Sequence, residues 1–227
     1  GLDGRILGRL EEELLKKVDC IVAASDHLAD GIRGRRRECE VLTHGVDLEF
    51  WKKERASWEL GEVSRVDASQ DSKLETRNPT PLILFWGVVD RRMNADWVLS
   101  HADAIDSGVI RLVGPKQNPD SRLAMHPKIE MPGPVEFEQL PKLAALADVL
   151  IMPYADLPVT RAMQPLKLKE YLATEKPVVA SRLPAVELWS DCLEMVDHQQ
   201  EFVARVLSLL SGVVRREPDD ARPGVPN

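Results

Sequence analysis

The pattern of hydrophobic and polar positions changes near Pro81. From there on, short apolar runs alternate with stretches whose apolar residues recur at helical spacing. Apolar runs of this kind are typical of strands in a parallel sheet that is covered on both faces. The predicted strands are residues 82–87, 109–114, 128–131, 148–153 and 177–180, and the predicted helices are residues 94–105, 139–147, 199–214 and one that begins at Pro165. This alternation predicts an α/β fold with a doubly wound parallel sheet.

Residues 1–51 show a shorter pattern of the same kind. Residues 1–17 are predicted to be helical, and residues 19–24 and 40–43 are predicted strands with a helix between them. Ser25 is expected to cap that helix, because its hydroxyl oxygen can accept a hydrogen bond from an N–H of the first turn. We expect this strand-helix-strand piece to belong to a domain whose other part precedes Gly1.

Two polar segments complete the predicted organisation. Residues 52–80 carry many charges and little periodicity, which indicates a linker or an exposed insertion. Residues 215–227 are rich in proline and charge, which is typical of a disordered tail. The predicted domains are therefore 1–51, as a remnant of one domain, and 81–214, as a second domain.

Composition and charge exclude several classes of protein. The formal net charge is −7, from 30 Lys and Arg against 37 Asp and Glu, which argues against a nucleic-acid partner. No apolar run approaches the ~18 residues of a membrane helix, and no signal-peptide pattern is present. Three widely spaced cysteines show no zinc pattern and suit a reducing cytoplasm. The basic run 35–37 is expected to be a solvated loop, so membrane contact is at most peripheral.

The most informative stretch is QPLKLKEYLATEKPVVAS, residues 164–181. Pro165 suits the first position of a helix, and the following amides of Leu166 and Lys167 form an anion site if that helix begins at the sheet edge. Glu170, one turn further, can accept hydrogen bonds from the hydroxyls of a sugar. The sequence thus predicts a site for a nucleoside diphosphate. The alternative is that Lys167 and Glu170 form an ordinary solvated pair on a helix surface.

Other candidate residues follow the predicted strands. Gly87, Gly114, Gly133 and Tyr154 all come directly after or at the end of an apolar run. Ligands of doubly wound sheets bind beyond the carboxyl ends of the strands, so these residues are expected to share one rim with Glu170. None of the glycines forms a G-x-G-x-x-G or P-loop motif, and we expect neither a bound cofactor nor a metal.

Several of these segments, in this order, resemble the group-one glycosyltransferases. PLKLKEYLATEKPVVAS resembles the donor-site segment of that family, closest to members of the teichuronic-acid type. LILFWGVVDRR, RLVGPK and KIEMPGPVEFEQLPKLAALADVLIMPY are similar to its other donor-domain segments, and VLTHGVD is similar to the turn before its interdomain linker. The resemblance implies the GT-B architecture, with residues 81–214 as a Rossmann-like donor domain and residues 1–51 as the end of the acceptor-binding domain.

The resemblance also implies roles for individual residues. Glu170 matches the glutamate that binds the donor ribose, and Arg91 and Arg92 lie in the loop whose basic residues neutralise the donor diphosphate. Two positions depart from the family pattern: Ala162 stands where a first glutamate is usual, and Glu175 stands where glycine is usual. If the corner at Glu175 is left-handed, its side chain carries a steric penalty of about 1 kcal/mol.

The expected function is transfer of a sugar from a nucleotide-diphosphate sugar to a glycan or lipid-linked acceptor. The resemblance implies retention of configuration, a role in cell-envelope polysaccharide synthesis and a cytoplasmic location. Three alternatives stay open: a sugar-nucleotide epimerase of the same architecture, a non-catalytic relative with an eroded donor site, and an ordinary Rossmann-like interaction domain. Since catalytic groups of the family come partly from the other domain, the 227 residues alone are expected to be inactive.

Overall fold

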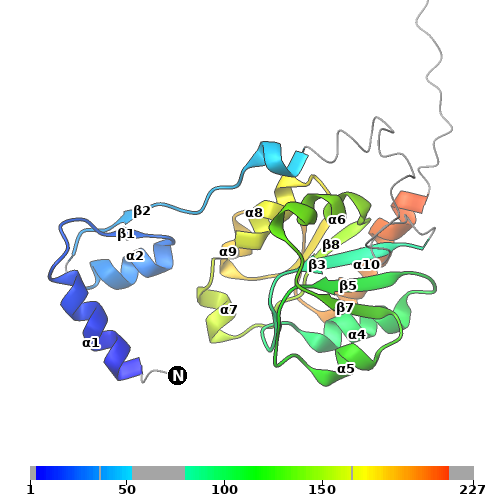
Figure 1. Cartoon of the computed structure of the whole chain (residues 1–227), viewed down its shortest axis with the longest axis horizontal. Coiled ribbons are helices and arrows are strands. Elements are labelled where there is room, and N and C mark those ends of the chain that lie inside the picture. Colours follow the sequence, from blue (N-terminus) through cyan, green and yellow to red (C-terminus); the bar gives the residue numbers. More distant parts are fainter. Residues whose placement is uncertain (1–3, 36, 53–79, 165, 215–227) are drawn as a thin grey trace, which may run out of the picture. The chain divides into compact units, whose positions relative to one another are not determined.

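The computed structural model (Figure 1) describes residues 4–35, 37–52, 80–164 and 166–214 of the chain. These residues group into two compact units, Gly1–Gly45 and Val46–Asn227. The interior of the predicted linker and the whole predicted tail lie outside the described residues. That the first unit is part of an acceptor-binding domain stays a prediction.

The described part of the second unit is built on a six-stranded parallel sheet in the order β10-β9-β8-β3-β5-β7. Its strands are β3 (Leu82–Trp86), β5 (Val109–Val113), β7 (Ile129–Gly133), β8 (Val149–Met152), β9 (Val178–Ser181) and β10 (Glu194–Val196). The central strands are almost wholly buried, because helices cover both faces of the sheet. The predicted α/β, doubly wound fold is confirmed.

The direction of chain winding reverses beside the first strand. The chain passes from β3 outward to β5 and β7, and then returns to β8 and continues outward through β9 and β10 on the other side. A crevice at the carboxyl ends of the strands forms at such a reversal, because the two neighbouring connections leave in opposite directions. Here the reversal lies between β3 and β8.

Helices pack on both faces of the sheet (Figure 1). Helix α10 contacts α4, and α4 contacts α5, on one face, while α6 and α8 lie on the other face. The helices are α4 (Ala95–Ala104), α5 (Ser121–Met125), α6 (Leu140–Leu146), α7 (Pro158–Ala162), α8 (Leu166–Ala173), α9 (Pro184–Glu187) and α10 (Gln199–Val214). Asn94 caps α4 by accepting a hydrogen bond from the Trp97 amide.

Several short elements were not predicted from the sequence. They are β10 at the sheet edge, a small parallel pair of β4 (Val89–Asp90) and β6 (Lys116–Gln117), the short helices α5, α7 and α9, and a 3₁₀ turn at Phe137–Gln139. Each is too short to show a hydrophobic period, so tertiary contacts decide its conformation.

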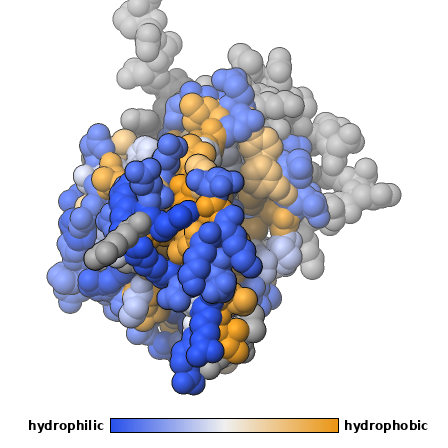
Figure 2. Space-filling view, turned by 90° about the vertical axis from the view of Figure 1, so that its left-hand side faces the viewer, coloured by the Kyte–Doolittle hydropathy of each residue, from blue (hydrophilic) through white to orange (hydrophobic). Residues whose placement is uncertain are grey.

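The first unit contains α1 (Gly4–Leu15), β1 (Val22–Ala23), α2 (Asp26–Arg33) and β2 (Glu40–Val41), with β1 and β2 parallel. Ser25 caps α2 as predicted, and its hydroxyl accepts a hydrogen bond from the Leu28 amide at 3.2 Å. No described residue of α1 is buried. Exposed apolar side chains of the chain are visible as orange patches among hydrophilic ones in Figure 2.

Among the described helices, none has both the length and the apolar character that crossing a bilayer requires.

Candidate functional site

Glycines bring three strand ends together at the carboxyl edge of the sheet. Gly87 donates a backbone hydrogen bond to Val113, and Gly114 donates one to Gly133. Gly114 has a φ of +138°, and a Cβ there would lie 2.0 Å from the Gly87 carbonyl oxygen. Gly133 has a φ of +99°, and a Cβ there would meet no atom within 4 Å. Any side chain at position 114 would therefore force β3 and β5 apart. At position 133 there is room for a side chain, and only the backbone conformation favours glycine.

The loop after β3 holds Arg92 against the edge of the neighbouring strand β8. Arg92 binds the Asp90 carboxylate through its guanidinium at 2.8 Å, and its carbonyl accepts a hydrogen bond from the Ala155 amide. Burial opposes the charge of Asp90, but the hydrogen bonds from Arg92 outweigh it and lower the pKa of that carboxyl. Tyr154 is buried beside this pair, and burial raises its pKa. Arg91 is exposed, whereas the ion pair with Asp90 holds Arg92 in place.

Glu170 is buried beside the end of β3. Its Oε2 accepts a hydrogen bond from the indole Nε1 of Trp86 at 2.9 Å and from the Nζ of Lys167 at 3.0 Å. The side chain of Glu170 is 8% exposed and that of Lys167 is 31% exposed. The pair is therefore not the solvated surface pair of the alternative interpretation. Because Trp86 is the last residue of β3, the carboxylate lies at the carboxyl edge of the sheet, beside the reversal of chain winding.

The beginning of α8 is described from Leu166 onward, and Pro165 lies outside the described residues. Leu166 is 39% exposed, whereas Leu168 and Tyr171 are buried. The apolar side of α8 thus faces the core. Along the chain, the backbone amides of its first turn come just before Glu170. Whether those amides hold a phosphate stays a prediction.

A stack of aromatic rings, which the sequence did not indicate, supports the Glu170 carboxylate. Trp86 stacks on Trp51 with ring centroids 5.4 Å apart and lies 4.0 Å from the ring of Tyr171. Trp51 belongs to residues 48–52, a helical segment too short to show a period. The only signal in the sequence was the density of aromatic residues around Trp51, which does not reveal their partners.

The two positions that depart from the family pattern differ in their surroundings. Ala162 is exposed at the end of α7. Glu175 has a φ of 56°, so the corner after α8 is left-handed, and its carboxylate pairs with Lys52 at 3.4 Å. The side chain at 175 thus carries the steric penalty expected for a residue other than glycine in this conformation.

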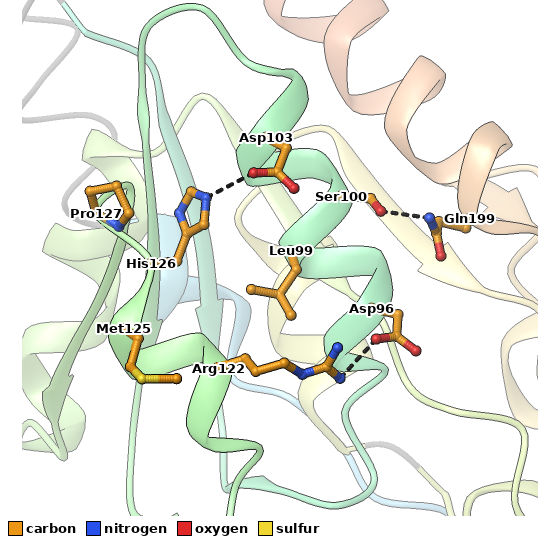
Figure 3. A pocket seen from close by; sticks show the side chains of 9 residues that line it. All are labelled: Asp96, Leu99, Ser100, Asp103, Arg122, Met125, His126, Pro127 and Gln199. Carbon is orange, nitrogen blue, oxygen red and sulfur yellow. Dashed lines mark hydrogen bonds and ion pairs between the residues drawn. The ribbon is translucent and has the colours of Figure 1, made fainter.

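A pocket of about 540 Å³ lies elsewhere on this unit, beside α4, α5 and the start of α10 (Figure 3). Its polar side chains bind one another: Arg122 binds Asp96 at 2.8 Å, and His126 lies 3.2 Å from Asp103. None of the predicted site residues that the structure describes lines this pocket. It is therefore a separate surface feature. Within the described ranges, no cluster of three or more His, Cys, Asp or Glu side chains could hold a metal.

The fold of this chain matches that of several solved structures. The structures of TarM (TM-score 0.61, 10% identity), WaaG of lipopolysaccharide biosynthesis (0.59, 15%) and sucrose-phosphate synthase from Thermosynechococcus elongatus (0.57, 17%) match 90%, 86% and 89% of this chain. The matches cover 39%, 54% and 52% of those chains. At these identities the likeness establishes the fold alone.

Membership of a family rests on the sequence. Residues 80–212, more than half of the chain, match the family described as glycosyl transferases group 1, and the chain belongs to that family. TuaH of Bacillus subtilis (strain 168), assigned to teichuronic acid biosynthesis as a glycosyltransferase, is 26% identical over 215 residues. This match covers 88% of the chain and 50% of TuaH, so the chain spans about half the length of this curated relative. The predicted family is confirmed.

Proposed function

We propose that this chain is the donor-binding part of a glycosyltransferase that uses a nucleotide-diphosphate sugar. The observation that carries the proposal is the position of Glu170, whose carboxylate lies at the carboxyl edge of the sheet beside the end of β3. A carboxylate held there can accept hydrogen bonds from the two hydroxyls of a ribose. Membership of the glycosyl transferases group 1 family supports this role.

The diphosphate is proposed to bind next to this carboxylate. As the sugar leaves, negative charge develops on the diphosphate, and fixed positive groups lower the energy of that transition state. Lys167, the amides at the start of α8, and Arg92 supply such groups without a metal. Lys167 lies 3.0 Å from Glu170, so it connects the proposed ribose and phosphate subsites. Gly87, Tyr154 and Gly133, at the carboxyl ends of neighbouring strands, are proposed to contact the donor as well.

Relatives support the chemical class of the donor. HepE of Anabaena, which matches 87% of this chain with 13% identity and a TM-score of 0.56, was solved in complex with UDP-glucose. A trehalose-phosphate synthase from Burkholderia vietnamiensis, with a TM-score of 0.59, is named as UDP-forming. We therefore propose a uridine nucleotide as the first donor to test. The link to TuaH, which is named for teichuronic acid biosynthesis, supports a role in making a cell-envelope glycan. A glycan or lipid-linked acceptor, a cytoplasmic location with at most peripheral contact at the inner face of the membrane, and retention of configuration are part of the proposal and follow from the resemblance to the family.

Calorimetry with UDP, GDP and ADP tests the proposal. The unmodified chain should bind one of the three, and Glu170→Gln should bind it more weakly, because a neutral amide is a poorer acceptor for ribose hydroxyls than a carboxylate. Glu12→Gln, in the exposed helix α1, is the control and should bind as the unmodified chain does. Absence of heat with all three nucleotides would contradict the proposal.

A second candidate function is that of a non-catalytic relative with an eroded donor site. Alanine at position 162 and the left-handed Glu175 favour it, since both depart from the family pattern. Absence of binding to all three nucleoside diphosphates would support this alternative. An epimerase would instead convert the bound sugar nucleotide with no acceptor present, which analysis of the nucleotide products would detect.

A further inference from the structure

The indole of Trp86 occupies an unusual position for a tryptophan in a hydrophobic core. The residue is 1% exposed, and its ring contacts those of Trp51 and Tyr171. Its only polar atom, Nε1, donates a hydrogen bond of 2.9 Å to Oε2 of Glu170. The backbone of Trp86 is fixed as well, because its amide donates to the hydroxyl of Tyr171 at 2.9 Å. Neither the ring nor the N–H of Trp86 can therefore turn without breaking contacts.

One ring of this stack, that of Trp51, comes from the segment that begins the second unit. Asp47 caps residues 48–52 by accepting a hydrogen bond from the Phe50 amide at 3.1 Å. This cap starts the turn that carries Trp51, which is 3% exposed and whose ring plane lies 16° from that of Trp86. Phe50 stacks in turn on Phe137, with ring centroids 4.8 Å apart. The ring of Trp86 is thus packed against residues 48–52, a segment distant from it in sequence.

We propose that Trp86 is a positioning residue for Glu170, and that Trp51 keeps Trp86 in place. This inference rests on the proposed function, in which Glu170 binds the ribose of a nucleotide. An ionised carboxylate offers about four acceptor positions. Trp86 and Lys167 both bind Oε2, and Lys167 also donates to Oε1 at 3.4 Å. These three contacts fix the plane of the carboxylate, and the remaining acceptor position of Oε1 is left for the hydroxyls of the sugar. A group held in its binding orientation loses less conformational freedom when the ligand arrives.

Core packing alone would require the ring of Trp86 but not its N–H. The variant Trp86→Phe separates these two roles, since phenylalanine keeps an aromatic ring beside Trp51 and Tyr171 and removes the donor. The control is Trp97→Phe, because Trp97 packs on Phe202 of α10 and makes no contact with Glu170 that the structure records. Both variants lose the same atoms, but only Trp86→Phe removes an N–H that binds Glu170.

The experiment measures the affinity of the full chain for whichever of UDP, GDP and ADP binds most tightly. Trp86→Phe should weaken that affinity about tenfold, as expected when a charge-assisted hydrogen bond that orients a binding group is lost. Trp97→Phe should leave it unchanged. The 2′,3′-dideoxy analogue of the same nucleotide, which lacks the ribose hydroxyls, should bind Trp86→Phe and the unmodified chain equally. A merely structural role would weaken both ligands alike.

The outcomes separate this inference from the proposed function. Binding that Glu170→Gln weakens but Trp86→Phe leaves intact would overturn the inference and leave the proposed function standing. Absence of binding in the unmodified chain would overturn both. Equal loss of affinity for the nucleotide and its dideoxy analogue would also overturn the inference, because the effect would not pass through the ribose.

A measurement on the unmodified chain decides the question if Trp86→Phe fails to fold. With 15N in the indole nitrogens, the Nε1–H signal of Trp86 is assigned through its proximity to the Tyr171 ring. Addition of the nucleotide should shift this signal, because the hydrogen-bond acceptor Glu170 becomes shared with the ribose. The dideoxy analogue should leave it in place, and a signal that stays in place with both ligands would contradict the inference.

Discussion

Two buried polar side chains lie on opposite faces of the same sheet and differ in whether they have hydrogen-bond partners. Glu170 of α8 is 6% exposed and accepts hydrogen bonds from Trp86 and Lys167. His101 of α4 is 0% exposed, and neither of its ring nitrogens has a hydrogen-bond partner among the described residues. Its ring instead packs on that of Phe202 of α10, with the two ring planes at 78°.

The fold thus provides hydrogen-bond partners for the buried Glu170 but, among the described residues, none for the buried His101. Burying an unpaired polar group costs free energy, whereas a buried carboxylate with two donors recovers much of its desolvation cost. Burial lowers the pKa of His101 to about 4, so that imidazole stays neutral in the folded chain at neutral pH. We therefore expect Glu170 to contribute to binding and His101 to lower stability.

The largest effect is expected for Glu170→Ala. Nucleotide affinity should fall at least 100-fold, which corresponds to about 2.7 kcal/mol, since all acceptors for the ribose are removed. The free energy of unfolding should also fall by about 1–3 kcal/mol, because the buried N–H of Trp86 loses its partner. Calorimetry measures the first quantity and urea unfolding measures the second.

Glu170→Gln is the matched control for stability. Its amide oxygen can still accept from Trp86, so its free energy of unfolding should lie closer to that of the unmodified chain. If alanine and glutamine at this position gave equal stability, the hydrogen bond to Trp86 would not be the reason that the side chain is tolerated in the core.

The next effect is the dependence of stability on pH through His101. Its pKa in the folded chain, about 4, is lower than the value of 6.5 for the free side chain. Below pH 6.5 the unfolded chain therefore binds a proton that the folded chain does not, and stability is lost as the pH falls from 6.5 to 4. At pH 5 the loss is about 2 kcal/mol relative to pH 7.5, at about 1.4 kcal/mol per pH unit.

His101→Leu should remove this part of the pH dependence and raise stability at pH 7.5, because two unpaired polar atoms leave the core. Urea unfolding at pH 5 and pH 7.5 measures both effects. The exposed His198, changed to glutamine, serves as the control and should leave the His101 contribution intact. A His101→Leu variant with the pH dependence of the unmodified chain would show that another group titrates.

The smallest effect is expected at the end of α8, on the same face as Glu170. Glu175→Gly should raise the free energy of unfolding by about 0.5–1 kcal/mol, since glycine adopts the left-handed conformation without steric cost. Loss of the half-exposed pair with Lys52 reduces this gain only slightly. Thermal unfolding measures it, with Glu175→Ala, which keeps the strain and loses the pair, as a control that should not be stabilised.

Much of the sheet was predictable from the sequence. The apolar runs at residues 82–87, 109–114 and 148–153 differ from the observed strands β3, β5 and β8 by no more than one residue at either end, and α10 has the predicted bounds. These segments are long enough for their apolar pattern to reflect burial. The edge strand β10 was missed, because three residues that begin with a glutamate show no strand pattern.

The surroundings of Glu170 were less predictable. A lysine and a glutamate three residues apart on a helix are usually solvated, and the sequence contains no local sign that Trp86, 84 residues earlier, reaches the carboxylate. Likewise, Trp51 had no predicted role, although it is buried in the core of the second unit. Such contacts depend on which strand end and which helix are neighbours in the folded chain.

The sequence by itself determined the alternation of strands and helices, the family and the candidate glutamate, because each is encoded in local composition and spacing. The tertiary structure alone decided that this glutamate is buried, that Trp86 and Lys167 share it, and that Trp51 clamps the indole. The physical reason is that a hydrogen bond of 2.9 Å between distant segments exists only after the sheet has assembled. The chemistry of a side chain is local, whereas its partners are set by the fold.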